Sequence, residues 1–477
     1  MLKRYKELSR PLKTTIGYTL SNVMQKGIMF LAIPIYTRIL TTQQYGRYSV
    51  FLAWIDIFEI ITTFRISWGG YVVGLNKYSE DKDRYTSALQ CLSIVITSCF
   101  FLMYLICRET VNGVTDMSTE VTVMIFCIMY FIPAMKFWTM RERVEYRYKK
   151  VLLVTTLMSF FTVLLGTWGA LKIEEKDIAV IGAKVIVQAL IGFFLIIKNC
   201  SKKFVFFHKE YWERTLKFNI PLITYYLSMV ILNSSDRIVI KQLIGETEAG
   251  IYSVAYTASM FTLLFSTSLN GVLQPWLYKR MKENDTDGVS YVINFSLLLV
   301  SLINLVVIIF APEIVMILAP KQYHEAIWVI PPLAASVNVM FFYQHFVNIE
   351  FYFEESKLTS IASIGAAILN LALNYYLIPL YGYLAAGYTT LISYLLFGIV
   401  HYCFMRYVCK KNDYSQKLID INSMIKILLL FFIVSLIILV GYQVRTVRGI
   451  VLIVIACALI VRWKEIKISV KKFMELF

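Results

Sequence analysis

Residues 288–311 read GVSYVINFSLLLVSLINLVVIIFA, a stretch without a single charged side chain. A helix rises about 1.5 Å per residue, so a run of this length crosses the roughly 30 Å hydrocarbon core of a bilayer. The rest of the chain is similar, because 58% of its 477 residues are hydrophobic and only 16% are charged. A soluble protein of this length could not bury so much apolar surface. We therefore predict an all-α integral membrane protein.

Comparable runs recur along the whole sequence, bounded by charges, glycine or proline. They predict about fourteen transmembrane helices, the last two being the weakest because the final uncharged run is short. The first run follows a basic N-terminus but is too long for a signal peptide, so it is interpreted as an uncleaved span. The predicted spans are residues 14–37, 46–65, 87–107, 120–140, 151–171, 177–198, 217–240, 249–278, 288–311, 325–350, 357–378, 382–405, 426–444 and 446–463.

The basic residues predict the topology. The formal net charge is +16, and roughly three quarters of the 47 lysines and arginines fall in alternate loops that include both termini. Cytoplasmic loops of membrane proteins collect Lys and Arg, so both termini are predicted to be cytoplasmic. The same distribution accounts for most of the charge without a nucleic-acid partner.

A short sequence repeat predicts how the spans are grouped. Residues 46–50 read GRYSV and residues 250–254 read GIYSV, and each copy opens a span after a short outer loop. Six predicted spans separate the copies, so both have the same orientation, as in a parallel repeat. We expect two six-helix lobes, residues 1–200 and 201–410, followed by two additional helices and a basic tail in residues 411–477. Within that tail, residues 464–473 are either an amphipathic helix on an anionic leaflet or an ordinary basic extension.

Motifs for catalysis are absent from the sequence. It has no phosphate-binding glycine loop, no GxGxxG and no HExxH. Its four histidines lack metal spacing and are interpreted as interface or loop residues, and no cofactor is expected. The predicted outer loops are short, which argues against a membrane glycosyltransferase or polymerase. The chain is therefore expected not to be an enzyme.

Charged residues inside predicted spans are the candidate functional residues. A charge in the bilayer core costs about 2.5 kcal/mol or more, so it usually faces a polar cavity. Cations there suit an anionic substrate, and arginine grips phosphate oxygens with a planar fork. The candidate substrate-binding cations are Lys26, Arg38, Lys184 and Arg237. Two further cations near span ends, Arg65 and Lys241, are predicted to extend to lipid headgroups instead.

Acidic residues in the spans are the candidates for ion coupling or charge pairing. They are Asp56, Glu59 and Asp236. The first two are three residues apart and share one helix face. They could pair with a cation in the cavity or bind a coupling ion, H⁺ or Na⁺. Asp236 could pair with Arg237 beside it or with a neighbouring span.

Three stretches resemble one family of transporters. They are IPIYTRILTTQQYGRYS at residues 33–49, SDRI at 235–238 followed by AGIYSVA at 249–255, and PLYGYLAAG at 379–387. These segments are similar to the Wzx-like polysaccharide flippases of the MOP superfamily, which also contains multidrug exporters of the MATE type. The resemblance covers essentially the whole chain. Arg38, Asp236 and Arg237 match the family's motif positions; the other candidates rest on their place in the spans.

The resemblance implies a fold and a function. The fold would be MATE-like, and the protein would lie in a bacterial cytoplasmic (inner) membrane. The substrate would be an oligosaccharide repeat unit linked by pyrophosphate to undecaprenol, flipped by alternating access for O-antigen, capsule or exopolysaccharide synthesis. Membrane lipids and a polysaccharide polymerase would be partners. A lipid II flippase or a multidrug exporter of the same superfamily remains the alternative.

Overall fold

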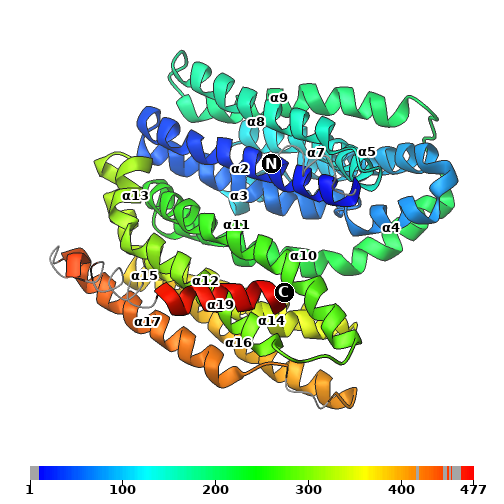
Figure 1. The fold of residues 1–477 in the computed structure, drawn as a ribbon. Helices are drawn as coiled ribbons and strands as arrows, with labels where there is room; N and C mark the ends of the chain where they lie inside the picture. Colours follow the sequence, from blue (N-terminus) through cyan, green and yellow to red (C-terminus); the bar gives the residue numbers. More distant parts are fainter. Residues whose placement is uncertain (1–9, 415–417, 444–447, 451–452, 454–462, 477) are drawn as a thin grey trace. The chain divides into compact units, whose positions relative to one another are not determined.

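The structure, a computed structural model, describes all residues except 1–9, 415–417, 444–447, 451–452, 454–462 and 477, and the described chain is built from helices (Figure 1). This confirms the predicted all-α class. The α-helices are α2 (Arg10–Ile39), α3 (Thr42–Thr63), α4 (Gly69–Lys77), α5 (Lys82–Ile106), α6 (Arg108–Thr115), α7 (Thr119–Val144), α8 (Tyr148–Ala170), α9 (Lys176–Cys200), α10 (Lys209–Leu243), α11 (Glu246–Lys282), α12 (Val289–Ile309), α13 (Ala311–Leu318), α14 (Ile330–Tyr352), α15 (Ser356–Tyr381), α16 (Ala385–Lys411), α17 (Ile421–Gln443) and α19 (Trp463–Leu476). Two short 3₁₀ helices are η1 (Ser79–Asp81) and η2 (Lys321–Trp328).

Ten of the described helices are long and apolar enough to cross a membrane. An eleventh span is possible if η2 and α14, which meet at a 44° bend, cross together. The predicted number of fourteen is not confirmed. α2 and α3 are not among the ten, because polar and charged residues interrupt their apolar runs. The last predicted span, residues 446–463, lies largely outside the described residues.

The chain divides into two compact units, Met1–Gly250 and Ile251–Phe477. In the first unit α2 packs on α8, α7 and α8 pack on α9, and α3 packs on α10. In the second unit α14 packs on α16 and α12, while α15 packs on α16 and α17 on α12. These two units reflect how the helices pack in this structure. The lobe boundaries at residues 200 and 410 stay a prediction.

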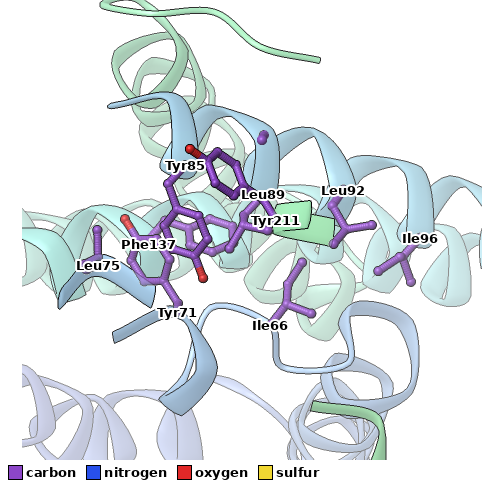
Figure 2. Close-up of a cluster of buried hydrophobic side chains, with 10 residues drawn as sticks. Ile66, Tyr71, Leu75, Tyr85, Leu89, Leu92, Ile96, Phe137 and Tyr211 are labelled. Carbon is purple, nitrogen blue, oxygen red and sulfur yellow. The ribbon is translucent and has the colours of Figure 1, made fainter. Parts of the chain in front are cut away.

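Aromatic side chains form a buried core in the first unit (Figure 2). The Tyr71 and Phe137 rings meet edge to face with centroids 4.7 Å apart, and the Tyr71 hydroxyl lies 2.8 Å from that of Thr86. Ile66 and Phe137 are fully buried in this cluster. Each directly follows a basic residue, Arg65 or Lys136, so the core fixes the backbone that presents those two cations.

The two copies of the sequence repeat meet through their glycines. A Cβ atom on Gly46 would lie 1.8 Å from the carbonyl oxygen of Glu246, and one on Gly250 would lie 2.4 Å from that of Thr42. The arrangement is reciprocal, since each carbonyl belongs to the residue four positions before the other glycine. Glycine lets helix backbones approach this closely, as in other membrane helix pairs. The first turns of α3 and α11 therefore cross in contact at structurally equivalent positions.

Amide and hydroxyl side chains link the buried helices of the second unit. Asn348 of α14 donates to Asn270 of α11 at 2.8 Å, and Ser301 of α12 donates to Asn338 of α14 at 3.1 Å. Such interhelical hydrogen bonds are a common adhesive between apolar helices in membranes. These contacts between helices of the second unit therefore need no charged side chain.

The basic C-terminal segment is a helix, α19, that packs within the second unit. The indole N–H of Trp276 and the guanidinium of Arg280 donate to the carbonyl oxygen of Leu476 at 3.1 and 3.0 Å. The Phe295 and Phe473 rings are in contact, tilted by 34° with centroids 5.0 Å apart. The helix is therefore formed and anchored on α11 and α12, and its contact with an anionic leaflet stays a prediction.

Candidate functional site

Two carboxylates lie on one face of α3, inside the first unit. Asp56 is half-buried and Glu59 is buried, with 6% of its surface exposed. The helix that carries them starts at a capping box, in which the Thr41 hydroxyl and the Gln44 side chain satisfy each other's backbone N–H groups. It ends at Phe64, whose left-handed backbone turns the chain sharply. The carboxylates are thus held on a rigid, well-terminated helix.

Glu59 forms the centre of an ion-pair cluster. Its Oε1 pairs with the Lys136 ammonium from α7, and the Nε of Arg65 lies 3.8 Å from the same oxygen. The side chain of Arg65 is only 16% exposed. The prediction that Arg65 extends to lipid headgroups is therefore wrong. A carboxylate within reach, in a medium of low dielectric, holds the guanidinium more strongly than distant headgroups do.

Aromatic rings flank the same two cations. The Arg65 guanidinium lies 5.1 Å from the Trp68 ring centroid and 5.2 Å from that of Tyr226, on α10. The Lys136 ammonium lies 5.2 Å from the Trp68 ring. Cations over aromatic faces gain electrostatic attraction from the ring quadrupole. We call Glu59, Arg65, Trp68, Lys136 and Tyr226 the cation–aromatic cluster; its formal charge is one positive unit.

A second polar chain joins α3 to α10 on the same side of the first unit. The Ser234 hydroxyl donates to Asp56 Oδ2 at 3.2 Å, and Arg237 Nη2 donates to the Ser234 oxygen at 3.3 Å. Asp56 also interacts electrostatically with Arg237 and with Lys184 of α9. The structure thus brings Lys184 and Arg237 near Asp56, and Ser234 links Asp56 to Arg237.

The other sequence candidates lie in different surroundings. Lys26 and Arg38 are both exposed on α2, and the Arg38 guanidinium donates to the Pro34 carbonyl oxygen of its own helix at 2.8 Å. Asp236 is buried, with 2% of its surface exposed. Arg237, beside it in the sequence, contacts Ser234 of its own helix, and through that serine it is connected to Asp56 of α3.

Ion pairs also gather at the predicted outer end of the first unit. Arg47 of α3 binds both carboxylate oxygens of Asp177 on α9, at 2.7 and 3.2 Å, and lies 3.8 Å from Glu246. Lys241 lies 3.2 Å from Asp116 and 3.5 Å from Glu246, and its side chain is 9% exposed. The predicted extension of Lys241 to headgroups is therefore wrong, for the same reason as that of Arg65. These groups line a cavity of about 290 Å³.

The arrangement suits an anionic ligand near the cation–aromatic cluster. Lys136 and Arg65 supply more positive charge than Glu59 neutralises, and the guanidinium offers a planar set of donors for phosphate oxygens. Trp68, 37% exposed, presents an aromatic face beside them. No cluster of His, Cys, Asp and Glu able to hold a metal ion occurs among the described residues. The chemistry available here is recognition and charge pairing.

Reading the sequence alone missed Lys136, Trp68 and Tyr226. Lys136 lies on α7 about two turns before the helix ends at Val144, close to the basic residues that predict an inner loop. Nothing in the sequence links residue 136 to residue 59. A retrievable signal was the tryptophan three positions after Arg65, since aromatic residues next to cations at span ends often contact them.

The comparisons with known proteins agree with this description. Residues 12–281 match the model of the polysaccharide biosynthesis protein family. A protein of the Lsg locus of Haemophilus influenzae strain Rd is 22% identical over 370 residues, covering 76% of this chain and 89% of the relative.

Two solved structures show the fold. The inward-facing conformation of a multidrug resistance MATE family transporter of the MOP superfamily has a TM-score of 0.65 at 14% identity, covering 84% of this chain and 100% of that one. The lipid II flippase MurJ in an inward closed conformation has a TM-score of 0.64 at 16% identity, covering 95% and 100%. The fold is thus that of transporters, not of enzymes. With more than half of its length matched by the family model, this multi-pass membrane protein belongs to the polysaccharide biosynthesis protein family and has the MOP transporter fold.

Proposed function

We propose that this protein is a flippase that moves a polyprenyl-pyrophosphate-linked oligosaccharide repeat unit across the cytoplasmic membrane. One observation carries the proposal: the chain belongs to a polysaccharide biosynthesis family and shares its fold with a lipid II flippase. The exported unit would serve synthesis of a surface polysaccharide such as O-antigen, capsule or exopolysaccharide.

The extent of the structural match favours a flippase over a drug exporter. The MurJ structure covers 95% of this chain, whereas the MATE transporter covers 84%. The match to the MurJ structure therefore leaves a smaller part of this chain without a counterpart than the match to the MATE transporter does. A fold alone does not fix a substrate, so the multidrug exporter stays as the second candidate.

Each candidate residue has a role in the proposed flippase. Lys26, Arg38, Lys184 and Arg237 would bind the anionic pyrophosphate or the sugars beside it, together with Arg65 and Lys136 of the cation–aromatic cluster. The acidic residues Asp56, Glu59 and Asp236 would pair with these cations when substrate is absent or bind a coupling cation. Exchange of carboxylate for phosphate as the partner of a buried cation keeps that cation paired throughout the cycle.

The transport cycle would follow from the repeat. Two six-helix lobes, residues 1–200 and 201–410, would open alternately to the two membrane faces, with both termini in the cytoplasm. A polysaccharide polymerase would receive the flipped unit on the outer face.

The test is deletion of the gene in its native host, followed by measurement of polyprenol-linked oligosaccharide in each leaflet and of surface glycan. A flippase predicts accumulation in the inner leaflet with loss of surface glycan, both reversed by the wild-type gene. Normal glycan without accumulation, in a strain with no second member of the family, would contradict the proposal. Drug sensitivity of the same strain, with normal glycan, would favour the exporter.

A further inference from the structure

A carboxylate and an imidazole form a fully buried pair in the second unit. Glu350 of α14 and His401 of α16 are both 0% exposed, and Glu350 Oε1 lies 2.8 Å from His401 Nδ1. The Thr359 hydroxyl of α15 donates to the other carboxylate oxygen, Oε2, at 3.0 Å. Three helices therefore meet at one carboxylate.

The surroundings make the charge state of this pair important. α12 has no charged side chain, nor has α11 between Ile251 and Tyr278, and Glu350 is the one Asp, Glu, Lys or Arg of α14. An ionised Glu350 beside a neutral His401 would leave one negative charge buried among apolar helices. Binding one proton gives a neutral pair, either imidazolium with carboxylate or imidazole with carboxylic acid. Burial strongly favours the neutral pair over the net charge.

The imidazole is held on one side only. His401 Nδ1 faces Glu350, whereas Nε2 is buried and has no hydrogen-bond partner among the described residues. The ring stacks on Tyr343 with centroids 5.6 Å apart and meets Phe397 edge to face at 4.3 Å. The contact with the carboxylate is thus the polar tether between α14 and α16, and its strength depends on whether the proton is present.

A cavity lies beside the residues that flank the pair in the sequence. A cavity of about 960 Å³ is lined by Ile349 and Tyr402, the residues next to Glu350 and His401. Arg406 and Lys410 of α16 and Asp420 before α17 line the same cavity. The cavity is on the side that the basic residues predict to be cytoplasmic. A small movement of α14 against α16 would therefore expose the pair to a hydrated space.

The titratable neighbours of the pair are few among the described residues. From α14, Tyr343 stacks on the imidazole and His345 lies further along the helix, its ring against Phe341. From α15 the contact is the Thr359 hydroxyl, which does not ionise near neutral pH. α12 carries Tyr291, which contacts Ser469 and Lys472. α17 carries Lys426, which is exposed.

We propose that Glu350 and His401 form a proton-binding site of the second unit, loaded when α14 and α16 are closed and emptied when they part. In transport, this site would make H⁺ the coupling ion, and that consequence rests on the proposed flippase function. The binding of a proton by the pair does not depend on the flippase function. It also locates coupling in the second unit rather than at Asp56, Glu59 or Asp236.

The first test measures protonation without substrate. Full-length protein in lipid nanodiscs is titrated between about pH 5 and pH 8, the range in which histidine pairs exchange protons, by infrared difference spectroscopy of the carboxyl and imidazole bands. We expect a pH-dependent signal that disappears in Glu350→Gln and in His401→Gln. The matched control is Glu355→Gln, which removes a carboxylate that is 22% exposed and pairs with Lys411, just before the start of α15. A spectrum that is the same in wild type and in Glu350→Gln would overturn the proposal.

The second test measures coupling. Proteoliposomes are loaded with lipid-linked oligosaccharide extracted from the deletion strain, and its distribution is followed with and without a pH gradient. A gradient of about one unit corresponds to about a tenfold change in distribution for one coupled proton. We expect this shift in wild type and Glu355→Gln, and its loss in Glu350→Gln while movement without a gradient continues. An unchanged shift in Glu350→Gln would overturn the coupling role.

Folding is separated from protonation by a swapped pair. The double variant Glu350→His with His401→Glu keeps one carboxylate and one imidazole facing each other. We expect it to restore the titration signal and the gradient response that the single variants lose. Restoration of abundance without either response would show that the pair serves only to hold the helices together. If the spectra support the site but no oligosaccharide moves, the flippase function fails and the proton site stands.

Discussion

The interiors of the two units differ in how they use polar groups. The first unit buries ions: Glu59 pairs with Lys136 and Arg65, and Asp56 connects to Arg237 through Ser234. The second unit links its helices through amides and hydroxyls, such as Asn338 with Ser301, and contains the Glu350–His401 pair. The repeat therefore preserved the glycine crossing of its two copies but not the chemistry of their interiors.

This difference separates ligand recognition from helix packing. A buried cation without a partner is costly, so a unit rich in ions must keep every cation paired, by protein or by ligand. Amide hydrogen bonds average about 0.6 kcal/mol in membrane proteins, so they stabilise a bundle without demanding a ligand. We infer that charges were retained in the first unit for recognition, and the following changes test that inference.

The largest effect is expected where the two copies meet. Gly46→Ala would place a methyl group 1.8 Å from a backbone carbonyl oxygen, and Gly250→Ala would place one at 2.4 Å. Neither carbonyl can move without shifting a helix turn, so each change should cost about 3 kcal/mol or more. Membrane abundance and thermal unfolding in detergent measure this. The control is Gly27→Ala, whose Cβ would meet nothing within 4 Å; normal stability of Gly46→Ala would disprove the close crossing.

The next largest effect is expected at Glu59. Glu59→Gln leaves Lys136 and Arg65 without their carboxylate, and removal of one partner from a buried pair costs about 3–5 kcal/mol. Lys136 is 25% exposed, so solvent reduces the expected loss to about 2 kcal/mol. The unfolding temperature and the amount of surface glycan should both fall. Glu213→Gln, at a carboxylate 54% exposed, should change neither. Equal behaviour of the two variants would contradict the cluster.

A smaller loss is expected for Arg47→Gln at the predicted outer end. The Arg47 side chain is 41% exposed, so its bidentate pair with Asp177 should contribute about 1 kcal/mol. The contribution should shrink as salt is raised, because a partly exposed pair is screened. Unfolding curves at low and high ionic strength measure the difference. A loss that does not depend on salt would mean that Arg47 acts through packing.

The second unit should tolerate loss of one amide. Asn338→Leu removes the hydrogen bond from Ser301 but keeps a side chain of similar size, so the expected cost is less than about 1 kcal/mol. Unfolding temperature and glycan export should stay close to wild type. A loss as large as that of Glu59→Gln would remove the distinction drawn between the two interiors.

The smallest effect on stability is expected at Lys26. Its side chain is exposed on α2, so Lys26→Ala should leave unfolding unchanged, within about 0.5 kcal/mol. If Lys26 binds substrate, surface glycan should still fall while membrane abundance holds, and Arg38→Ala should behave in the same way. Lys172→Ala, on a predicted outer loop, provides a matched exposed control. Normal export in both variants would remove α2 from the cationic binding surface.

The amino-acid sequence was enough to predict the all-α membrane class, to nominate polar candidates inside the spans and to match GRYSV with GIYSV. These properties follow from local composition and periodicity, which do not depend on distant contacts. The motif resemblance also indicated the polysaccharide family that the family model shows and the fold that the solved structures share. The number of spans was harder to predict, because polar and charged residues lower the mean hydropathy of α2 and α3.

Tertiary structure decided which charges meet. Arg65 and Lys241 were expected at lipid headgroups, but Arg65 pairs with Glu59, to which α7 also brings Lys136, and Lys241 pairs with Glu246 and with the distant Asp116. Likewise, 51 residues separate Glu350 from His401, and no spacing in the sequence connects them. A charge in a medium of low dielectric takes whichever partner the folded helices bring within reach. That choice depends on how helices pack side by side, and hydropathy along a single chain does not contain it.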